Sequence, residues 1–292
     1  MTEEKKDYTK TASDKGKKIV AAIKEKTAMT AYQLTIKENS QPDIFDSKFG
    51  GVPYWDMTKE YPTDATGNKM MLLAQINFTK AALDDERLPK EGLLQFFIAS
   101  EDDVYGMDFD EQDSQQNFRV VFHENIDMTV TKEQVQSLNI PVATDENNEY
   151  TPVFKESTVE FHKTIAYMGT ENESFDKIFC QIVKEQTGED IGDMSSYQYL
   201  NEDDHSYLYD ELCNTGHWLL GYPFFTQYDP RGYGEEATAN YYDTLLFQMD
   251  SDMIDGEDYV LWGDCGVANF FINSEALKKK DFSKVMYNWD CC

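Results

Sequence analysis

The sequence predicts an α+β protein with two related, mainly antiparallel β-rich halves that arise from an internal duplication, and with a few helices packed on them. A motif that occurs twice is the first observation behind this prediction. Short segments of alternating apolar residues and a scarcity of long helical segments are the others. Each copy of the motif has a Gly-x-Pro turn, a strand-like segment with Gln-x-Asn or Gln-x-Asp, and a glycine followed by Phe-Phe-Ile. The copies comprise Gly51–Pro53, Leu72–Asn77 and Gly92–Ile98, and Gly221–Pro223, Leu245–Asp250 and Gly266–Ile272.

The spacing of the motif indicates that the two copies are equivalent supersecondary units. The distance from the proline to the glutamine is 22 residues in the first copy and 25 in the second, and that from the glutamine to the glycine is 17 and 18. This period is longer than that of solenoid or propeller repeats, so we expect the copies to pack about a pseudo-twofold axis in one compact unit. The expected boundaries are 1–30 for a basic amphipathic helix region, 31–138 for the first half, 139–156 for a loop or linker, and 157–292 for a helical insert with the second half.

Apolar periodicity assigns the individual elements. Alternating or short apolar segments predict strands at 31–37, 71–78, 93–99, 118–123, 158–168, 244–250, 259–262, 268–272 and 284–288. Helical spacing predicts helices at 14–26, 131–138 and 174–186. The first of these helices carries lysines around an apolar face, and we expect that face to dock on the core.

The charge of the chain disfavours one class of partner and favours another. The 26 Lys and Arg residues and 55 Asp and Glu residues give a net charge of −29, although residues 1–30 are net positive. Such a surface repels phosphate backbones, so we expect no nucleic-acid partner. The same surface raises the encounter rate with a basic protein partner.

The apolar residues and the cysteines favour a cytoplasmic protein. No apolar run approaches the roughly 18 residues that a membrane span requires, and residues 1–6 lack the apolar region of a signal peptide. Five irregularly spaced cysteines fit reduced thiols better than a disulfide framework. The sequence assigns no role to Cys265, Cys291 or Cys292.

Several strings of residues resemble the YwqG family. They are Ser47–Tyr54, Leu72–Phe78, Gly221–Arg231, Trp262–Asp264 and Asn288–Cys292. The resemblance extends over residues 40–292 and leaves the N-terminal helix region largely outside. It implies a bacterial cytosolic protein with a domain of unknown function, and it supplies no activity and no catalytic residues.

Familiar catalytic and cofactor motifs are absent from the sequence. There is no GxxxxGK[ST] or GxGxxG phosphate loop, no HExxH and no GxSxG. The four histidines are isolated from one another, so a zinc site would have to assemble from distant positions. We therefore expect no cofactor and favour a protein that is not an enzyme.

One acidic segment is a weak candidate for a metal site. Seven acidic residues and no basic residue occur in 101–113. Asp108, Asp110 and Asp113 are the candidates, because carboxylate oxygens suit a hard cation such as calcium. The segment is not an EF-hand, since Asp113 stands where the sharp turn requires glycine. The alternative is a solvated acidic loop.

The polar residues repeated in both copies are the candidate ligand-binding residues. Gln75 and Asn77 match Gln248 and Asp250, and residues two apart on a strand share one face. If the copies pair about a twofold axis, these four side chains line a central cleft. The candidates for its rim are Arg231, Asp252, Trp262 and Asp264. The alternative is a buried hydrogen-bond network that holds the repeats together.

These observations favour a non-catalytic binding module with a strongly acidic surface and a basic protein partner. An immunity or antitoxin-like role is one version of this hypothesis. One alternative is a small-molecule or cation-binding protein that uses a cleft between the repeats. Another is a hydrolase with paired carboxylates among Asp250, Asp252 and Asp264.

Overall fold

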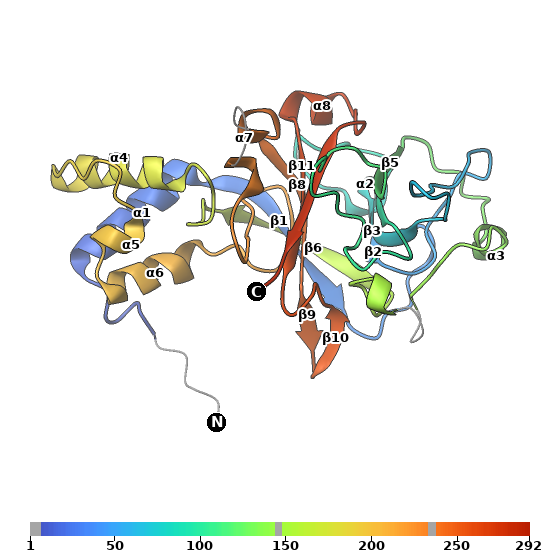
Figure 1. Cartoon of the computed structure of the whole chain (residues 1–292), viewed down its shortest axis with the longest axis horizontal. Helices are drawn as coiled ribbons and strands as arrows, with labels where there is room; N and C mark the ends of the chain where they lie inside the picture. Colours follow the sequence, from blue (N-terminus) through green and yellow to red (C-terminus); the bar gives the residue numbers. More distant parts are fainter. Residues whose placement is uncertain (1–6, 144–147, 233–237) are drawn as a thin grey trace.

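The computed structural model describes residues 7–143, 148–232 and 238–292, and it confirms the α+β class (Figure 1). Its largest element is a ten-stranded sheet in the order β12-β11-β8-β7-β1-β6-β2-β3-β4-β5, in which neighbouring strands are antiparallel. Its strands are β1 (Met29–Lys37), β2 (Lys48–Phe49), β3 (Met71–Asn77), β4 (Leu93–Ile98), β5 (Phe118–His123), β6 (Ser157–Ala166), β7 (His217–Leu219), β8 (Thr244–Asp250), β11 (Val267–Ile272) and β12 (Val285–Asp290). A separate two-stranded sheet contains β9 (Asp252–Ile254) and β10 (Glu257–Val260).

The central pair of the large sheet is β1 and β6. Their ladder runs from Met29 opposite Ala166 to Lys37 opposite Thr158. On the far side of β1 lies β7, which leads to β8, β11 and β12, and on the far side of β6 lies β2, which leads to β3, β4 and β5. The strand that precedes the first half in the sequence, β1, thus pairs with the second half. The strand that precedes the second half, β6, pairs with the first half.

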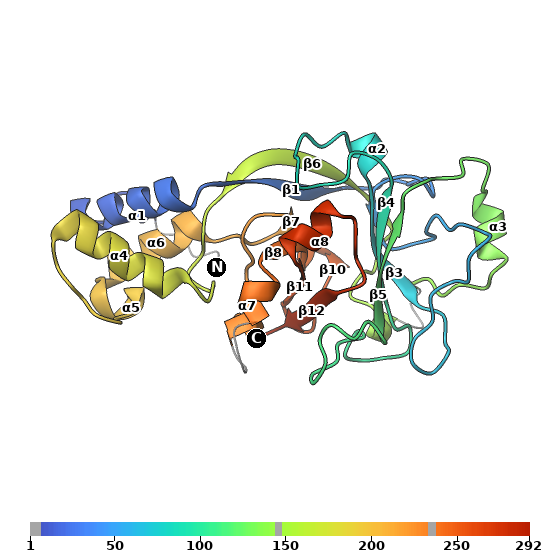
Figure 2. The same cartoon turned by 90° about the horizontal axis from the view of Figure 1, so that it is seen from above.

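The sheet curves so that its two halves face each other, with β1 and β6 above them in the view of Figure 2. Aromatic rings meet across the interior: the Phe96 ring centroid lies 4.8 Å from those of Phe247 and Phe270, and that of Phe118 lies 5.1 Å from that of Tyr287. These residues belong to one core cluster that draws on both halves. The faces that point inward therefore form the main hydrophobic core.

Each half of the sheet also buries its outer face. The first half is covered by a cluster that includes Tyr54, Trp55 and Val135, and the second by one that includes Phe225 and Tyr242. Because both faces are covered, the residues of β4 and β11 are buried without alternation. This explains the Phe-Phe-Ile string in both strands.

Helices α1 (Asp14–Thr27), α4 (Phe175–Thr187), α5 (Ser196–Tyr199) and α6 (Glu202–Leu212) form a lobe at one end of the molecule (Figures 1 and 2). The apolar face of α1 packs there with residues of α4 and α6 in a cluster of its own. Asp204 of α6 accepts hydrogen bonds from the backbone N and the Oγ of Ser13, at 2.6 and 2.7 Å, at the start of α1. The remaining helices are short: α2 (Phe78–Ala81), α3 (Lys132–Gln136), α7 (Thr238–Tyr241), α8 (Ser274–Lys278), and the 3₁₀ turns η1 (Asn148–Tyr150) and η2 (Pro230–Gly232).

Most predicted elements are present with boundaries shifted by a few residues. The strand predicted at 259–262 is different, because β10 ends at Val260 and pairs with β9 outside the large sheet. The strands β2, β7 and β9 and the helices α2, α5, α6, α7 and α8 were not predicted from the sequence. Helix α6 begins after a capping Asn201 and has three acidic residues in its first turn, which are helix-start signals, but few apolar residues follow.

The segment expected to be a loop or linker, 139–156, lies in part outside the described residues. Its described portion contacts the second half of the chain: Phe154 N donates to the Tyr259 carbonyl at 3.0 Å, and Leu261 N donates to the Pro152 carbonyl at 2.8 Å. Among the residues that the structure describes, none of the helices has the length and apolar character needed to cross a membrane.

The two halves have the same backbone irregularities at matching positions. An extra residue disrupts the ladder of β3 with β4 at Leu73 and that of β8 with β11 at Leu246. Left-handed backbone occurs at Gly50 and Gly51 after β2 (φ 62° and 74°) and at Leu220 and Gly221 after β7 (φ 64° and 92°). Leu220 adopts a conformation that usually favours glycine, which indicates that the turn itself is required there.

The turn after β2 is held by a buried lysine. The side chain of Lys48 is fully buried, and its Nζ donates to the Glu156 carboxylate at 2.7 Å and to the Val52 carbonyl. Burial lowers the pKa of Lys48 from its usual value, and the attraction of Glu156 opposes this shift. Gly51 leaves room for the carboxylate, since a Cβ built on it would lie 2.1 Å from Glu156 Oε1.

We expect Glu156→Ala to destabilise the fold by about 3 to 5 kcal/mol, because it leaves the buried Lys48 cation without its counterion. Urea denaturation of the variant and the wild type measures this difference. Glu160→Ala is the matched control, since Glu160 pairs with Lys37 on the exposed surface of the same sheet, and its removal should cost less than about 1 kcal/mol. Equal losses in the two variants would contradict the assigned role of Glu156.

A buried histidine makes the stability depend on pH. His123 Nε2 donates to Gln95 Oε1 at 2.9 Å, since the Gln95 amide nitrogen is itself a donor to Tyr54 O. His123 Nδ1 is buried and has no partner among the described residues. Burial lowers the pKa of His123 from 6.5 to about 4.

Between these two pKa values the unfolded chain binds a proton that the folded chain does not, so stability falls as the pH falls from about 6.5 to about 4. We expect this group to account for a loss of about 3 kcal/mol. The test compares unfolding free energies at pH 7 and near pH 4 for the wild type, His123→Gln and the exposed-site control His162→Gln. The pH-dependent loss should shrink in His123→Gln alone, and an unchanged loss in that variant would refute the assignment.

Candidate functional site

The repeated glutamines are buried and hydrogen-bonded within their own halves. Gln75 Oε1 accepts from Tyr54 N at 3.0 Å, and Gln75 Nε2 donates to the carbonyls of Ile44 and Asp46 at 2.8 Å. Its partners belong to the loop that covers the outer face of the first half. Gln75 therefore points away from the interior that the two halves share.

Gln248 repeats this arrangement in the second half. Its Oε1 accepts from Phe224 N at 2.8 Å, and its Nε2 donates to the carbonyls of Asn214 and Gly216 at 2.8 Å. Three equivalent hydrogen bonds thus hold a covering loop to β3 and to β8. The structure does not bring Gln75 and Gln248 together in one cleft, and their amides have the geometry of a structural network.

Asn77 and Asp250, the second pair of repeated residues, also form hydrogen bonds to adjacent loops. Asn77 Nδ2 donates to the Phe45 carbonyl at 2.7 Å, and Asn77 N donates to Ser47 Oγ at 2.9 Å. Asp250 accepts from Gly216 N at 2.6 Å, and its own N donates to a ring nitrogen of His217 at 3.1 Å. Burial raises the pKa of Asp250.

Asp250 and Asp252 are the two predicted residues that do line one pocket, a polar depression of about 360 Å³ beside β1. His217 lies between them. Its Nδ1 accepts from Asp250 N, so its Nε2 carries the proton that is donated to Asp252 Oδ2 at 3.3 Å. Because both ring nitrogens are engaged, His217 has no lone pair available to accept a proton from a substrate.

The other rim candidates lie apart from this pocket. Arg231 is buried, binds Asp229 with its Nε and Nη2 at 2.9 and 2.6 Å, and lies 4.1 Å over the Phe271 ring. Trp262 is fully buried in the core, with its Nε1 lacking a partner among the described residues. Asp264 is exposed in the turn before β11. These three residues do not converge with Gln75 or Gln248.

The acidic segment binds itself and its neighbours. Asp108 Oδ1 accepts from the backbone N of Asp110 and of Glu111 at 2.9 Å, and Asp113 accepts from the Tyr242 hydroxyl. Asp110 is exposed. In residues 7–143, 148–232 and 238–292, no group of three or more His, Cys, Asp or Glu side chains is arranged to hold a metal ion. Asp108, Asp110 and Asp113 therefore form a cluster of negative charge at the surface.

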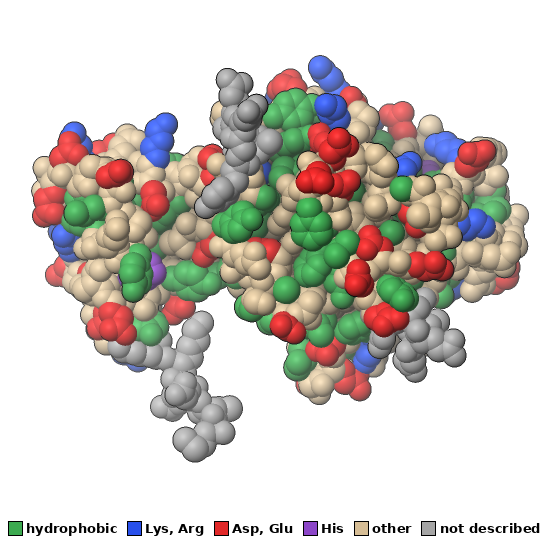
Figure 3. Space-filling model, viewed as in Figure 1, with side chains coloured by type: hydrophobic (Ala, Val, Ile, Leu, Met, Phe, Trp, Pro, Cys, Tyr) green, Lys and Arg blue, Asp and Glu red, His purple; other side chains and the backbone are tan. Residues whose placement is uncertain are grey.

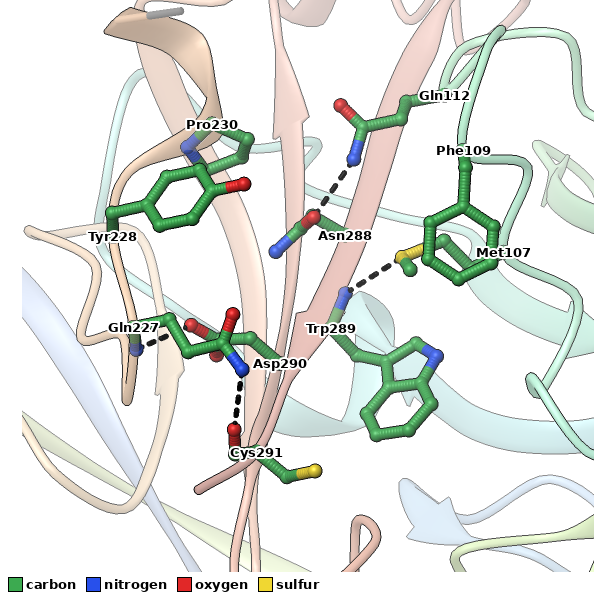
Figure 4. Close-up of a pocket in the computed structure, with 10 residues that line it drawn as sticks. All are labelled: Met107, Phe109, Gln112, Gln227, Tyr228, Pro230, Asn288, Trp289, Asp290 and Cys291. Atoms are coloured by element: carbon green, nitrogen blue, oxygen red, sulfur yellow. Dashed lines mark hydrogen bonds between the residues drawn. The ribbon is translucent and has the colours of Figure 1, made fainter.

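A cleft of about 380 Å³ opens where the segment after β4 meets β12, and we take it as the candidate site (Figure 4). Three segments contribute: the loop between β4 and β5, the loop before η2, and the C-terminal part of β12. Its lining residues are Met107, Phe109, Gln112, Gln227, Tyr228, Pro230, Asn288, Trp289, Asp290 and Cys291. Figure 4 shows Tyr228 and Pro230 on one side and Phe109 and Met107 on the other, with Asn288 between them.

Hydrogen bonds fasten the first wall of the cleft to its floor. Gln112 Nε2 donates to Asn288 Oδ1 at 2.7 Å, and the Gln112 carbonyl accepts from Tyr287 N at 2.9 Å. The thioether of Met107 accepts from Trp289 N at 3.4 Å. These contacts occupy the free edge of β12, so a ligand of this cleft meets side chains and not an open strand edge.

The second wall is fixed in the same way. Gln227 N donates to an Asp290 carboxylate oxygen at 2.8 Å, and Gln227 Nε2 donates to the Cys291 carbonyl at 2.6 Å. Burial raises the pKa of Asp290, although the backbone donors lower it in part. Both walls are therefore positioned before any ligand binds, which reduces the entropy cost of binding.

The floor presents one unused donor. Asn288 is only 8% exposed, and its Oδ1 is taken by Gln112. Its Nδ2 lies on the opposite side, towards Tyr228 in Figure 4, and in the described part of the chain it donates to no protein atom. A ligand with a carbonyl or hydroxyl oxygen would satisfy this amide.

This site was not predicted from the sequence, because its lining residues do not lie at the positions that recur in both halves. The loop from 99 to 117 between β4 and β5 is longer than the one between β11 and β12, so the cleft forms where the halves differ. Tyr228 and the segment Asn288–Cys292 stood within strings that resemble the YwqG family, and these strings were the available signal.

Comparison with known proteins gives a family and no activity. A family model described as "Domain of unknown function (DUF1963)" matches residues 47–291. No curated protein matches the chain. The matched region contains every residue that lines the cleft, and it leaves α1 and β1 outside.

We expect Gln248→Ala to lower the free energy of unfolding by about 3 to 5 kcal/mol, because it leaves Phe224 N and two carbonyls buried without partners. Urea denaturation provides the measurement. Gln181→Ala is the control, since Gln181 is exposed on α4 and bonds only to Glu185 there. A Gln248→Ala protein as stable as this control would return Gln248 to the list of ligand-binding candidates.

Proposed function

We propose that this chain, which belongs to the DUF1963 family, is a non-catalytic binding module that receives a basic polypeptide segment in the cleft beside β12. The segment belongs to a protein partner, and an immunity or antitoxin-like role is one version of this proposal. Three features support it: exposed aromatic walls, an unused amide donor on the floor, and a high density of negative charge.

The observation that carries the proposal is the pair of exposed aromatic side chains at the mouth of the cleft. Phe109 is 71% exposed and Tyr228 is 53% exposed, and they lie on opposite walls. Large exposed aromatic residues cost solvation free energy, and where they flank a cleft they are typical of a binding site. Aromatic faces also attract the cations of lysine and arginine side chains.

The charge around the cleft suits a cationic segment. The wall that carries Phe109 belongs to the stretch 101–113, which has seven acidic residues and no basic one. On the face in Figure 3, hydrophobic side chains gather over β12 and acidic side chains lie beside them. Complementary charge raises the association rate and selects against acidic partners.

The Asn288 amide makes a polypeptide the most suitable ligand. A basic side chain accounts for the carboxylates and the aromatic rings, but it offers no acceptor to Asn288 Nδ2. A peptide carbonyl supplies that acceptor next to a basic side chain. The combination of donor, aromatic walls and negative charge therefore favours a peptide over a free metal cation.

A second candidate function uses the polar pocket beside β1. Asp252 lies there with its carboxylate in contact with His217, and Thr35 and Asp250 line the same depression. A small cationic or hydroxylated ligand fits this lining. The carboxylate hydrolase has weaker support, because Asp264 does not line this pocket with Asp250 and Asp252.

The origin and setting of the chain complete the proposal. We propose that the halves arose by internal duplication, on the grounds that Gln75 and Gln248 make equivalent hydrogen bonds and that Leu73 and Leu246 interrupt the ladders at equivalent points. The resemblance to the YwqG family supports a bacterial, cytoplasmic setting for this acidic protein.

We expect the purified protein to bind a synthetic peptide of alternating lysine and alanine, and to ignore the same peptide with glutamate in place of lysine. Isothermal titration calorimetry at about 50 and 300 mM salt measures the affinity, which should fall at the higher salt as charges are screened. Phe109→Ala and Tyr228→Ala should each weaken binding about fivefold or more, through loss of aromatic contact.

Tyr197→Ala is the matched control, because Tyr197 is 78% exposed but lies on α5 in the helical lobe. Its affinity for the lysine peptide should equal that of the wild type. Equal weakening in all three variants, or equal binding of the glutamate peptide, would refute the cleft as the site.

A further inference from the structure

The outer edge of β5 is an unpaired edge of the large sheet, since no strand of the described chain lies beyond it. Val120 N donates to Gln115 Oε1 at 2.8 Å, so Val120 directs its backbone groups away from β4. Because this direction repeats every two residues in an antiparallel strand, the backbone N and O of Phe122 also point outward. Neither atom has a hydrogen-bond partner among the residues that the structure describes. On the opposite edge of the sheet, by contrast, the Gln112 carbonyl already accepts from Tyr287 N of β12.

A groove of about 550 Å³ lies along this edge, and we call it the β5 groove. β5 forms one side of it, and Lys280, Phe282 and Ser283, which lie between α8 and β12, form the other. Gln115 joins the two sides, because its Nε2 donates to the Phe282 carbonyl at 2.9 Å. The ring centroids of Phe122 and Phe282 lie 5.3 Å apart. The β5 groove thus places an apolar surface next to unpaired backbone groups, which is the combination by which a sheet binds an additional strand.

The β5 groove is positively charged in a chain that is acidic as a whole. Its lining includes Arg119 and Lys280 and no acidic residue, whereas Asp and Glu outnumber Lys and Arg by 55 to 26 in the chain. A neighbouring depression of about 270 Å³ shares Lys280 and adds two glutamates and three basic residues, Arg87, Lys90 and Lys278. The charge of this surface therefore complements an acidic ligand and disfavours the basic segment proposed for the cleft.

Arg119 is the cation best placed to bind an acidic ligand. Its Nε donates to the Gln115 carbonyl at 3.0 Å and its Nη2 to the Thr63 carbonyl at 3.5 Å, which uses only part of the donors of a guanidinium. In the described ranges, Arg119 forms no ion pair with a carboxylate. Other ion pairs of this surface are Arg87–Asp85, Lys278–Glu275 and Lys280–Glu124. The pair of Lys280 with Glu124 is exposed and therefore contributes little, so a ligand carboxylate can replace Glu124.

We infer that β5 binds an extended acidic segment of a partner protein as an added antiparallel strand. Directly opposite residues of antiparallel strands direct their side chains to the same face of the sheet. A residue that bonds to the backbone N and O of Phe122 therefore places its side chain beside Phe122 and Phe282, where an apolar residue fits. The residues before and after it point to the face that carries Arg119, where a carboxylate fits. A segment that extends to Val120 replaces the Gln115 amide with a peptide carbonyl.

An acidic segment suits this edge better than a second copy of the chain does. Pairing two β5 strands would bring the Arg119 side chains of both copies to one interface and would add a second net charge of −29. The net charge of the chain does not prevent an acidic segment from binding. At physiological salt, charges more than about 8 Å apart are largely screened, so the cations beside the β5 groove dominate.

The test uses the full-length protein and a blocked peptide in which glutamate and valine alternate. Valine is required because alanine presents little apolar surface to Phe122 and Phe282 and has a low strand propensity, so the alanine peptides of the cleft experiment do not report on this edge. Isothermal titration calorimetry should detect binding of the glutamate–valine peptide and none of a lysine–valine peptide.

Backbone methylation of the peptide separates strand addition from charge attraction. The valines are the residues expected to bond to Phe122, so methylation of the valine nitrogens should abolish binding, and methylation of the glutamate nitrogens should leave the affinity unchanged. The bound peptide should also slow hydrogen exchange of the Phe122 amide, measured by NMR, because this N–H gains a partner.

Arg119→Glu should weaken binding of the glutamate–valine peptide about tenfold or more, because it places like charges opposite each other. Lys177→Glu is the matched control, since it makes the same change of charge at an exposed position of α4, and its affinity should equal that of the wild type.

Absence of binding, equal loss from the two methylated peptides, or equal weakening in Arg119→Glu and Lys177→Glu would each overturn the inference. The methylated peptides leave the protein unaltered, so a folding defect in Arg119→Glu does not obscure the result. A dimer in sedimentation velocity that the glutamate–valine peptide disperses would assign the edge to a second copy and overturn the choice of partner. The cleft is tested with a peptide of opposite charge, so the two sites succeed or fail independently.

Discussion

The antiparallel ladder between β1 and β6 is the constraint on which the rest of the structure depends. In the strand order of the large sheet it is the pairing that joins the two halves, and it is the longest ladder in that sheet. The curvature around it lets Phe96 of one half meet Phe270 of the other. The covering loops, the buried amides and the cleft beside β12 all lie on walls that this pair holds at a fixed separation.

The fold could be predicted from the sequence where burial leaves a strong apolar signal. β4 and β11 are buried on both faces, and their Phe-Phe-Ile strings were correctly assigned to strands. β2 and β7 are two and three residues long, too short to show a period. The exchange of β1 and β6 between the halves could not be predicted either, because alternation specifies which face of a strand is buried and not which strand lies next to it.

The candidate site was predictable only in part, for a different reason. Polar residues kept at Gln75 and Gln248 fit either a ligand contact or a buried hydrogen bond, and the distinction depends on which loop folds over each strand. Asp250 and Asp252 do share a pocket, since they lie at the end of β8 and at the start of β9. Phe109 lies in the acidic stretch 101–113, for which the sequence indicated a metal site or a solvated loop, and its exposure follows from the path of the long loop between β4 and β5.

The exchanged strands also set the order in which the chain becomes complete during synthesis. Tyr32 of β1 pairs with Leu219 of β7, so β1 leaves the ribosome long before its second neighbour exists. At the usual 5 to 20 residues per second, this wait lasts roughly 10 to 40 seconds. During that time the nascent first half has an unpaired edge and half of its interior uncovered. Until the second half is made, this edge is open to non-native strand pairing, so the exchange of strands lengthens the period in which the nascent chain is prone to misassembly.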